Sequence, residues 1–205
     1  MGIIETVFLD FAAPVLRGAK PAALMLVKPR YLPDWARRQR ALRRATGLAT
    51  LEVGNRGGGL LVLVYDRAAM RSLLVDGRAT ALLSRYGYPL GRGRAAVFRH
   101  LRSRFSDAGT GFPHEVGVFL GYPTEDVRGF IENKGRNCVF CYYWKVYHDL
   151  ERAQEIFRRI DEARRYARVL LRESMSIHVA ASLLKASAVP QPSRPMVAGQ
   201  RQLLC

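Results

Sequence analysis

The sequence has no stretch of about 20 uncharged apolar residues, the length that a membrane-spanning helix needs. It also lacks the pattern of a secretory signal, because Glu5 and Asp10 stand where such a signal has a basic segment followed by an uninterrupted apolar one. We therefore expect a cytoplasmic protein with no membrane span.

Cysteine is scarce, with only Cys138, Cys141 and Cys205. A small odd number does not make a disulfide framework, and it fits a reducing compartment. Cys138 and Cys141 have the C-x-x-C spacing of thiol redox centres and of half a zinc site, although no second pair of this kind is present. The two thiols are candidate metal or redox residues, and a redox or iron-related role is one alternative function.

Several catalytic motifs are absent as well. Without G-x-S-x-G or H-E-x-x-H, the common hydrolase and metalloprotease templates do not apply. The glycine-rich segment GNRGGG lacks the GK[ST] ending of a phosphate-binding loop and precedes an apolar run typical of a strand. The sequence identifies no cofactor, and it does not decide between an enzyme and a binding protein.

Acidic residues are few, with 17 Asp and Glu against 33 Lys and Arg, which gives a formal charge of +16. Such a balance favours polyanionic partners such as nucleic acid. Nearly all the basic residues are arginine, however, a bias that the codon composition of a GC-rich genome also produces. A nucleic-acid or ribonucleoprotein accessory that uses the arginine-rich surfaces of residues 37–44 and 92–104 is therefore an alternative function.

Apolar periodicity predicts a single α+β domain over residues 1–186, with several helices covering a small mixed β-sheet. The expected helices cover residues 3–16, 33–47, 67–77, 78–87, 91–105, 123–135, 149–174 and 176–186, and the helix that begins at 149 is a long C-terminal one. Expected strands cover residues 21–29, a glycine-turned hairpin over 49–66, and residues 114–122 and 137–149. Three prolines and little periodicity predict a disordered tail over residues 187–205.

The segment FPHEVGVFLGYP, residues 112–123, places His114 and Glu115 in front of an apolar run. Neighbours in a strand face opposite ways, so the two side chains do not form a simple acid–base pair. His114 suits proton transfer near neutral pH, and Gly117 leaves a gap that a backbone or a ligand can approach. His114 and Glu115 are the candidate catalytic residues; the alternative is a structural role, with a hydrogen-bonded His114 and a solvated Glu115.

The run FPHEVGVFLGYPTEDVRGFIENKG and the downstream WKVY resemble the signature of a bacterial family catalogued as domain of unknown function 3793. The likeness is specific over residues 112–147 and looser over most of the chain before the tail. It includes APVLRGAK near the start, which ends in Gly18 and Lys20, although this chain has alanine where relatives often carry a cysteine before the proline. The resemblance implies no established activity, but it implies that polar and aromatic residues of the signature assemble one site.

We expect this site to bind a small molecule or cofactor where the His114 strand, the Tyr122 turn and the Trp144 strand converge. Lys134 or Lys145 is expected to supply a positive charge for an anionic group. The expected ligand-binding residues are Gly117, Tyr122, Asn133, Lys134, Trp144, Lys145 and Tyr147.

Overall fold

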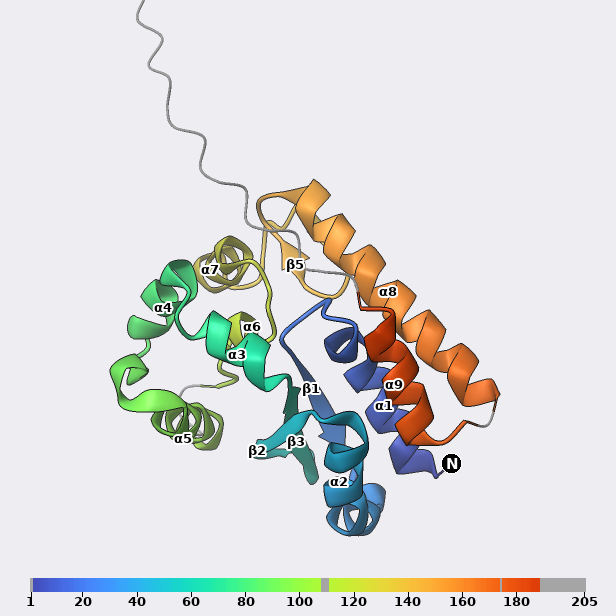
Figure 1. Cartoon of the computed structure of the whole chain (residues 1–205). Helices are drawn as coiled ribbons and strands as arrows, with labels where there is room; N and C mark the ends of the chain where they lie inside the picture. Colours follow the sequence, from blue (N-terminus) through green and yellow to red (C-terminus); the bar gives the residue numbers. More distant parts are fainter. Residues whose placement is uncertain (1, 108–110, 174, 189–205) are drawn as a thin grey trace, which may run out of the picture.

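A computed structural model describes residues 2–107, 111–173 and 175–188 (Figure 1). The fold is α+β, with a three-stranded antiparallel sheet in the order β1-β3-β2 and a separate two-stranded hairpin. The strands are β1 (Ala22–Val27), β2 (Ala49–Arg56), β3 (Gly59–Tyr65), β4 (Phe140–Cys141) and β5 (Lys145–Val146). The α-helices are α1 (Ile3–Leu16), α2 (Leu32–Thr46), α3 (Arg67–Leu73), α4 (Gly77–Ser84), α5 (Gly93–Ser106), α6 (Val116–Phe119), α7 (Thr124–Glu132), α8 (Leu150–Arg172) and α9 (Ile177–Ala186).

The β2–β3 hairpin closes on a two-residue turn at Gly57 and Gly58. Both residues have positive φ, +56° and +73°, a conformation that glycine adopts without steric cost and that matches the twist of paired strands. The predicted hairpin is therefore confirmed, and its glycines serve a tight turn.

Helices cover both faces of the sheet, as the alternation of side chains along β1 requires. Ala23, Met25 and Val27 point into a core shared with α1, α2, α8 and α9, whereas Ala22 points into a second core shared with α3 to α7. Figure 1 shows α1, α8 and α9 on one side of the sheet and α3 to α7 on the other. The small sheet with covering helices and the long α8 confirm the predicted fold class, although the sheet is antiparallel and not mixed.

The expected strand over residues 114–122 is wrong. The backbone turns at Pro113 and forms the short helix α6, because the amides of Val116 and Gly117 donate to the carbonyls of Pro113 and His114, at 3.0 and 3.1 Å. Gly121 ends this turn with φ +79°, and its missing Cβ makes room for the Pro21 ring. Strand β1, and not residues 114–122, supplies the third strand of the sheet.

The expected strand over residues 137–149 is also much shorter than predicted. Only β4 and β5 pair, because the chain reverses between them with the Tyr142 amide donating to the Trp144 carbonyl at 3.1 Å. The aromatic residues of this segment pack against α8 in a third apolar cluster with Trp144 and Phe157. The β-rich composition of this segment therefore reflects the burial of its side chains against a helix, and the segment is not part of the main sheet.

Glu115 is buried, contrary to the expectation of a solvated side chain. Only 1% of its surface is exposed, and its Oε1 accepts hydrogen bonds from Arg104 Nε at 2.8 Å and from the Tyr88 hydroxyl at 3.3 Å. Burial and the adjacent carboxylate raise the pKa of Tyr88 well above its usual range. Glu115 therefore joins α5 and α6 inside the core and does not face an open site.

The predicted boundary after residue 186 coincides with the end of α9, and the domain division stays a prediction. The tail expected over residues 187–205 lies outside the described residues from 189 onward. Within the described ranges, no helix combines the length and apolarity that crossing a bilayer requires.

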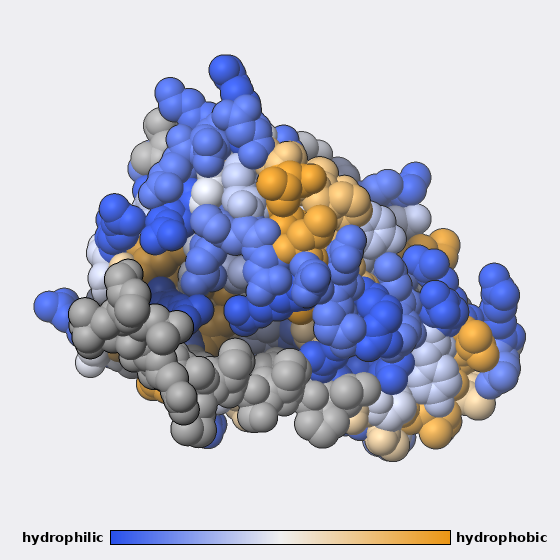
Figure 2. All heavy atoms as spheres, turned by 90° about the horizontal axis from the view of Figure 1, so that it is seen from above, coloured by the Kyte–Doolittle hydropathy of each residue, from blue (hydrophilic) through white to orange (hydrophobic). Residues whose placement is uncertain are grey.

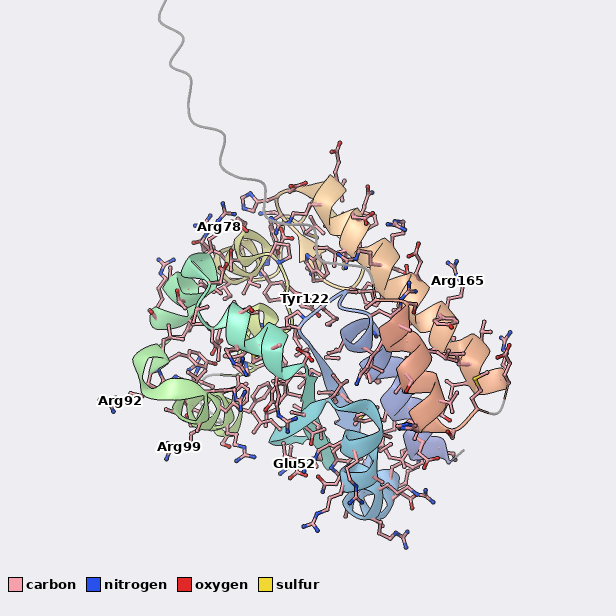
Figure 3. All side chains as sticks on the ribbon, in the orientation of Figure 1. Glu52, Arg78, Arg92, Arg99, Tyr122 and Arg165 are labelled. Atoms are coloured by element: carbon pink, nitrogen blue, oxygen red, sulfur yellow. The ribbon has the colours of Figure 1, made fainter. Side chains whose placement is uncertain are left out.

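Arg104→Met is expected to lower the free energy of unfolding by about 2 to 4 kcal/mol, because it leaves the buried Glu115 carboxylate without its cation. Chemical denaturation measures the change. Arg99→Met is the matched control: Arg99 lies on the same helix, is exposed and points outward (Figure 3), so its loss should change stability by less than about 0.5 kcal/mol. The double variant Arg104→Met, Glu115→Gln should recover part of the loss, and equal effects of Arg104→Met and Arg99→Met would contradict the role of the pair.

Candidate functional site

A cavity of about 500 Å³ lies between the two helical layers, beside the start of β1. Its wall comes from α1, the loop between α1 and β1, the start of β1, the segment from Phe112 to Phe130, the β4–β5 hairpin and α8. Most of this wall is apolar or aromatic, and its charged or titratable side chains are Lys20, His114, Asp126, Cys141, Lys145 and Arg164, together with the phenols of three tyrosines.

Lys20 enters the cavity from the loop between α1 and β1. The amide of Ala19 donates to the Pro14 carbonyl at 2.8 Å, which holds this loop against the end of α1. The Lys20 ammonium lies 5.4 Å from the centre of the Tyr122 ring, and among the described residues it makes no hydrogen bond or ion pair. Burial, and secondarily the positive charge of Arg164, lowers the pKa of Lys20 to about 8.

Stacked aromatic rings form part of the cavity wall. The Tyr122 ring stacks on Trp144 with 4.7 Å between centroids and 25° between planes, and Trp144 meets Phe157 of α8 edge-on at 4.3 Å. Burial raises the pKa of the Tyr122 phenol, so the ring stays neutral beside Lys20. Figure 3 shows Tyr122 in the interior of the molecule, where these layers meet.

Asp126 holds this wall in place. Its carboxylate is buried, with 2% of the residue exposed, and accepts hydrogen bonds from the Trp144 indole at 2.8 Å and from the backbone amides of Tyr147 and His148 at 2.8 and 3.1 Å. The sequence places Asp126 correctly in the first turn of α7. Its partners show that the carboxylate fixes the β4–β5 hairpin onto that helix, a role that helix-start chemistry alone does not reveal.

Arg164 of α8 brings a second cation to the cavity, but this one is paired. Its Nη2 lies 3.0 Å from Asp10 Oδ2. Its guanidinium carbon lies 5.6 Å from the ring centres of both Phe11 and Tyr143. Arg164 therefore contributes a positive field and a flat edge, while Asp10 balances its charge.

His114 lies at the exposed edge of the cavity. Its ring contacts Phe130 and Phe112, with centroid distances of 4.7 and 5.7 Å. Partial burial lowers the pKa of His114, and the nearby Glu115 carboxylate opposes this shift. The expected gap at Gly117 is filled, because a Cβ there would lie 2.9 Å from a Val127 methyl.

The structure brings together about half of the expected site residues. His114, Gly117, Tyr122, Trp144, Lys145 and also Cys141 border the cavity, whereas Glu115, Asn133, Lys134, Tyr147 and Cys138 do not.

The residues outside the cavity have structural contacts. The Asn133 amide caps α7 by donating to the Gly129 carbonyl at 2.8 Å, and Lys134 occupies an exposed turn with φ +51°. Tyr147 packs so closely on Gly129 that a Cβ at that glycine would lie 2.7 Å from the Tyr147 ring. Lys145 borders the cavity, but its ammonium donates to the Gly135 carbonyl at 2.6 Å.

The cysteine pair lies on the β4–β5 hairpin, with Cys138 half-buried, Cys141 exposed and both thiols free. Across the described ranges, no three His, Cys, Asp or Glu side chains form a group that could hold a metal ion. Cys205 lies outside the described residues. The metal and redox roles of the pair stay predictions.

The cavity residues that the sequence reasoning did not assign to a site include Lys20, Arg164 and Phe11. Lys20 belongs to the APVLRGAK segment of the family resemblance, which assigned it no role, and that segment was the one available signal. Arg164 looks like any other arginine of a basic helix. Phe11 belongs to an apolar helix face. Their convergence depends on how α1 and α8 pack, which local patterns do not encode.

The fold and the cavity together define a class: an α+β protein with an aromatic pocket, whose Lys20 has no ion-pair or hydrogen-bond partner in the described part of the chain. The chain belongs to the family described as Protein of unknown function (DUF3793), whose model matches residues 9–180, and this confirms the resemblance noted from the sequence. Comparisons with curated proteins and with solved structures give no match.

Asp126→Ala is expected to lower the free energy of unfolding by about 2 to 4 kcal/mol, because three N–H donors lose a charged acceptor. The Trp144 indole loses its partner as well, so intrinsic fluorescence should shift. Glu125→Ala is the control from the same helical turn. Glu125 pairs with Arg78 at 3.1 Å near the surface, so its loss should change stability by about 1 kcal/mol or less. Equal losses for both variants would show that the helix terminus, and not the hairpin, depends on Asp126.

Proposed function

We propose that the protein binds a small organic anion with a flat apolar part in the cavity beside Lys20. The observation that carries this proposal is the Lys20 ammonium, which reaches the cavity without an anionic or hydrogen-bonding partner among the described residues. A cation removed from water is costly unless it is paired, so an anionic ligand is the natural complement.

The charges around the cavity support an anion and not a cation. Lys20, Lys145 and Arg164 border it, while the carboxylate on its wall, Asp126, is engaged by three N–H donors. Burial, and secondarily repulsion by Arg164, lowers the pKa of Lys20, and a bound carboxylate, sulfonate or phosphate would offset both effects.

The walls of the cavity support a flat apolar body on this ligand. Aromatic rings of Phe11, Phe112, Tyr122, Phe130 and Trp144 border it, and such faces stack on planar groups. A volume of about 500 Å³ falls within the range of small-molecule sites. The pocket predicted from the sequence and this cavity share the Tyr122–Trp144 wall, and His114 at the edge supplies a group suited to proton transfer.

Lys20→Gln is expected to weaken the binding of anilinonaphthalene sulfonate, an aromatic anion, by about tenfold or more, because a charge-assisted hydrogen bond contributes about 1.5 to 3 kcal/mol. Fluorescence titration of the native protein measures the affinity. Lys28→Gln removes the same charge from an exposed position outside the cavity and should leave the affinity unchanged. Equal weakening by both variants, or none by Lys20→Gln, would argue against the proposal.

The pH dependence gives the same test a second measurement. Because Lys20 loses its proton near pH 8, the affinity of the wild type for the anion should fall as the pH rises through that value. Stability should change in the opposite sense. The fold lowers the pKa of Lys20 to about 8 from an unfolded value of about 10.4. Between about pH 8 and 10.4 the unfolded state therefore binds more protons than the folded state. The free energy of unfolding of the wild type should accordingly rise, relative to that of Lys20→Gln, as the pH rises through this range.

A second candidate function, nucleic-acid binding, is favoured by a hollow of about 360 Å³ at the end of α2. Arg40, Arg43, Arg44 and Arg67 border it without ion pairs among the described residues, and the Lys185 ammonium lies close to Gly47 in its floor. The face of the molecule seen in Figure 2 is mainly hydrophilic, with some apolar patches.

The other expected arginine surface, residues 92–104, is less suited to such a role. Arg102 donates to the Glu52 carbonyl and Arg104 to Glu115, so both are part of the fold. Figure 3 shows Arg92 and Arg99 pointing outward beside α5, on the side of the molecule opposite to Arg165 of α8. At the hollow beside α2, by contrast, four arginines without ion pairs to the described residues border one concave surface.

The double variant Arg40→Gln, Arg44→Gln is expected to weaken the binding of a fluorescent single-stranded RNA. It should also reduce the slope of log K against log salt by about 1.4, since each lost phosphate contact accounts for about 0.7. Fluorescence anisotropy at several salt concentrations measures both quantities. The double variant Arg92→Gln, Arg99→Gln carries the same charge change away from the hollow and should alter neither by more than a small amount. Equal effects of the two double variants would indicate binding by net charge alone.

A further inference from the structure

We infer that the Lys20 amine forms an imine with its ligand, so that the cavity accepts small anionic aldehydes or ketones and Lys20 is the nucleophile. This inference rests on the proposed binding of a small anion in the same cavity. It adds a covalent bond and names the carbonyl group as the feature that the ligand must carry.

The two lysines of the cavity differ in a way that singles out Lys20. Lys145 donates to the Gly135 carbonyl at 2.6 Å, so its nitrogen is engaged by the backbone. Lys20 has the Tyr122 ring beneath it at 5.4 Å and no acceptor among the described residues. An amine held in a cavity without an acceptor can present its lone pair to a carbonyl carbon once it loses its proton.

The surroundings of Lys20 favour the neutral amine. An apolar wall and a neighbouring cation, here Arg164, are the two conditions under which lysines become nucleophiles in proteins. They lower the pKa of Lys20 to about 8. At pH 7 its neutral fraction is therefore more than about a hundredfold larger than that of an exposed lysine with a pKa of about 10.4.

The reaction is balanced without any oxidant or reductant. The neutral amine nitrogen attacks the carbonyl carbon and a C–N bond forms while the C=O double bond opens to a carbinolamine. The carbinolamine then loses its oxygen, with both amine hydrogens, as water and leaves a C=N bond between the ligand and Lys20. The anionic group of the ligand meets the positive field of Arg164, while its flat part stacks on the aromatic wall.

Trapping with pyridoxal 5′-phosphate, an anionic aromatic aldehyde, followed by borohydride reduction and peptide mass spectrometry tests the inference. The chain has five lysines, so the label can be assigned at each: Lys20, Lys28, Lys134, Lys145 and Lys185. With probe and full-length protein at equal concentration near pH 7, Lys20 should carry at least about tenfold more label than any other lysine. Labelling spread evenly over the five lysines would overturn the inference.

Two further measurements separate imine formation from simple binding. Pyridoxine 5′-phosphate, the alcohol that cannot form an imine, should compete with the aldehyde in the wild type. Lys20→Arg removes the nucleophile, so the total label per protein should fall, whereas Lys28→Gln, which changes an exposed lysine outside the cavity, should keep the label at Lys20. If the wild type binds the alcohol but shows no excess label at Lys20, the imine inference is wrong and the proposed anion site is still supported. If neither probe nor anilinonaphthalene sulfonate binds, both the imine inference and the proposed anion site are wrong.

Discussion

The buried carboxylate of Asp126 is the constraint on which the arrangement around the cavity depends. It accepts hydrogen bonds from an indole and from two backbone amides, so its desolvated charge is satisfied by fixed donors. Through these bonds a hairpin with only two residues in each strand is tied to α7. Trp144 is thereby held where it can stack on Tyr122 and pack on α8. An isolated hairpin of this length would not be stable, so the wall of the cavity exists because the carboxylate anchors it.

The charges of Glu115, Asp126 and Lys20 are wholly or partly removed from water, and the fold treats them differently in a way that supports the proposed function. Glu115 has Arg104 at 2.8 Å, and Asp126 has three donors, so both are neutralised by the fold itself. Lys20 has an aromatic ring and a second cation as its neighbours. Structural charges are normally paired, because an unpaired one lowers stability. A charge that the fold leaves uncompensated at a cavity is therefore better explained by a ligand than by a structural role.

The sequence predicted the elements whose signals are local. The α2 and α7 helices have proline at or near their start and an acidic first turn, and the β2–β3 hairpin has two glycines at its turn. It failed at residues 114–122, where an apolar run rich in β-formers folds as a turn and α6. There the burial of Glu115 against Arg104, and of Gly121 against Pro21, outweighs the local preference. About half of the cavity-lining candidates could be predicted, because these polar and aromatic residues lie close together in the family-like part of the sequence. Lys20 and Arg164 could not be predicted, because they are about 140 residues apart and only tertiary packing brings them together.

The large positive charge of the chain draws attention to its arginines, yet Lys20 at the cavity has the greater capacity for selective binding. Two unit charges 4 Å apart interact by about 1 kcal/mol in bulk water and by about 4 kcal/mol at the effective dielectric constant of a protein surface. Salt screens the exposed arginines of α2 further, while the partly buried Lys20 keeps most of its attraction. The arginine surface therefore suits loose, salt-dependent contact with polyanions, whereas Lys20, backed by stacked rings and by the charge of Arg164, suits a defined small anion. The family match over residues 9–180 includes every element that builds this cavity, from the later part of α1 to α8.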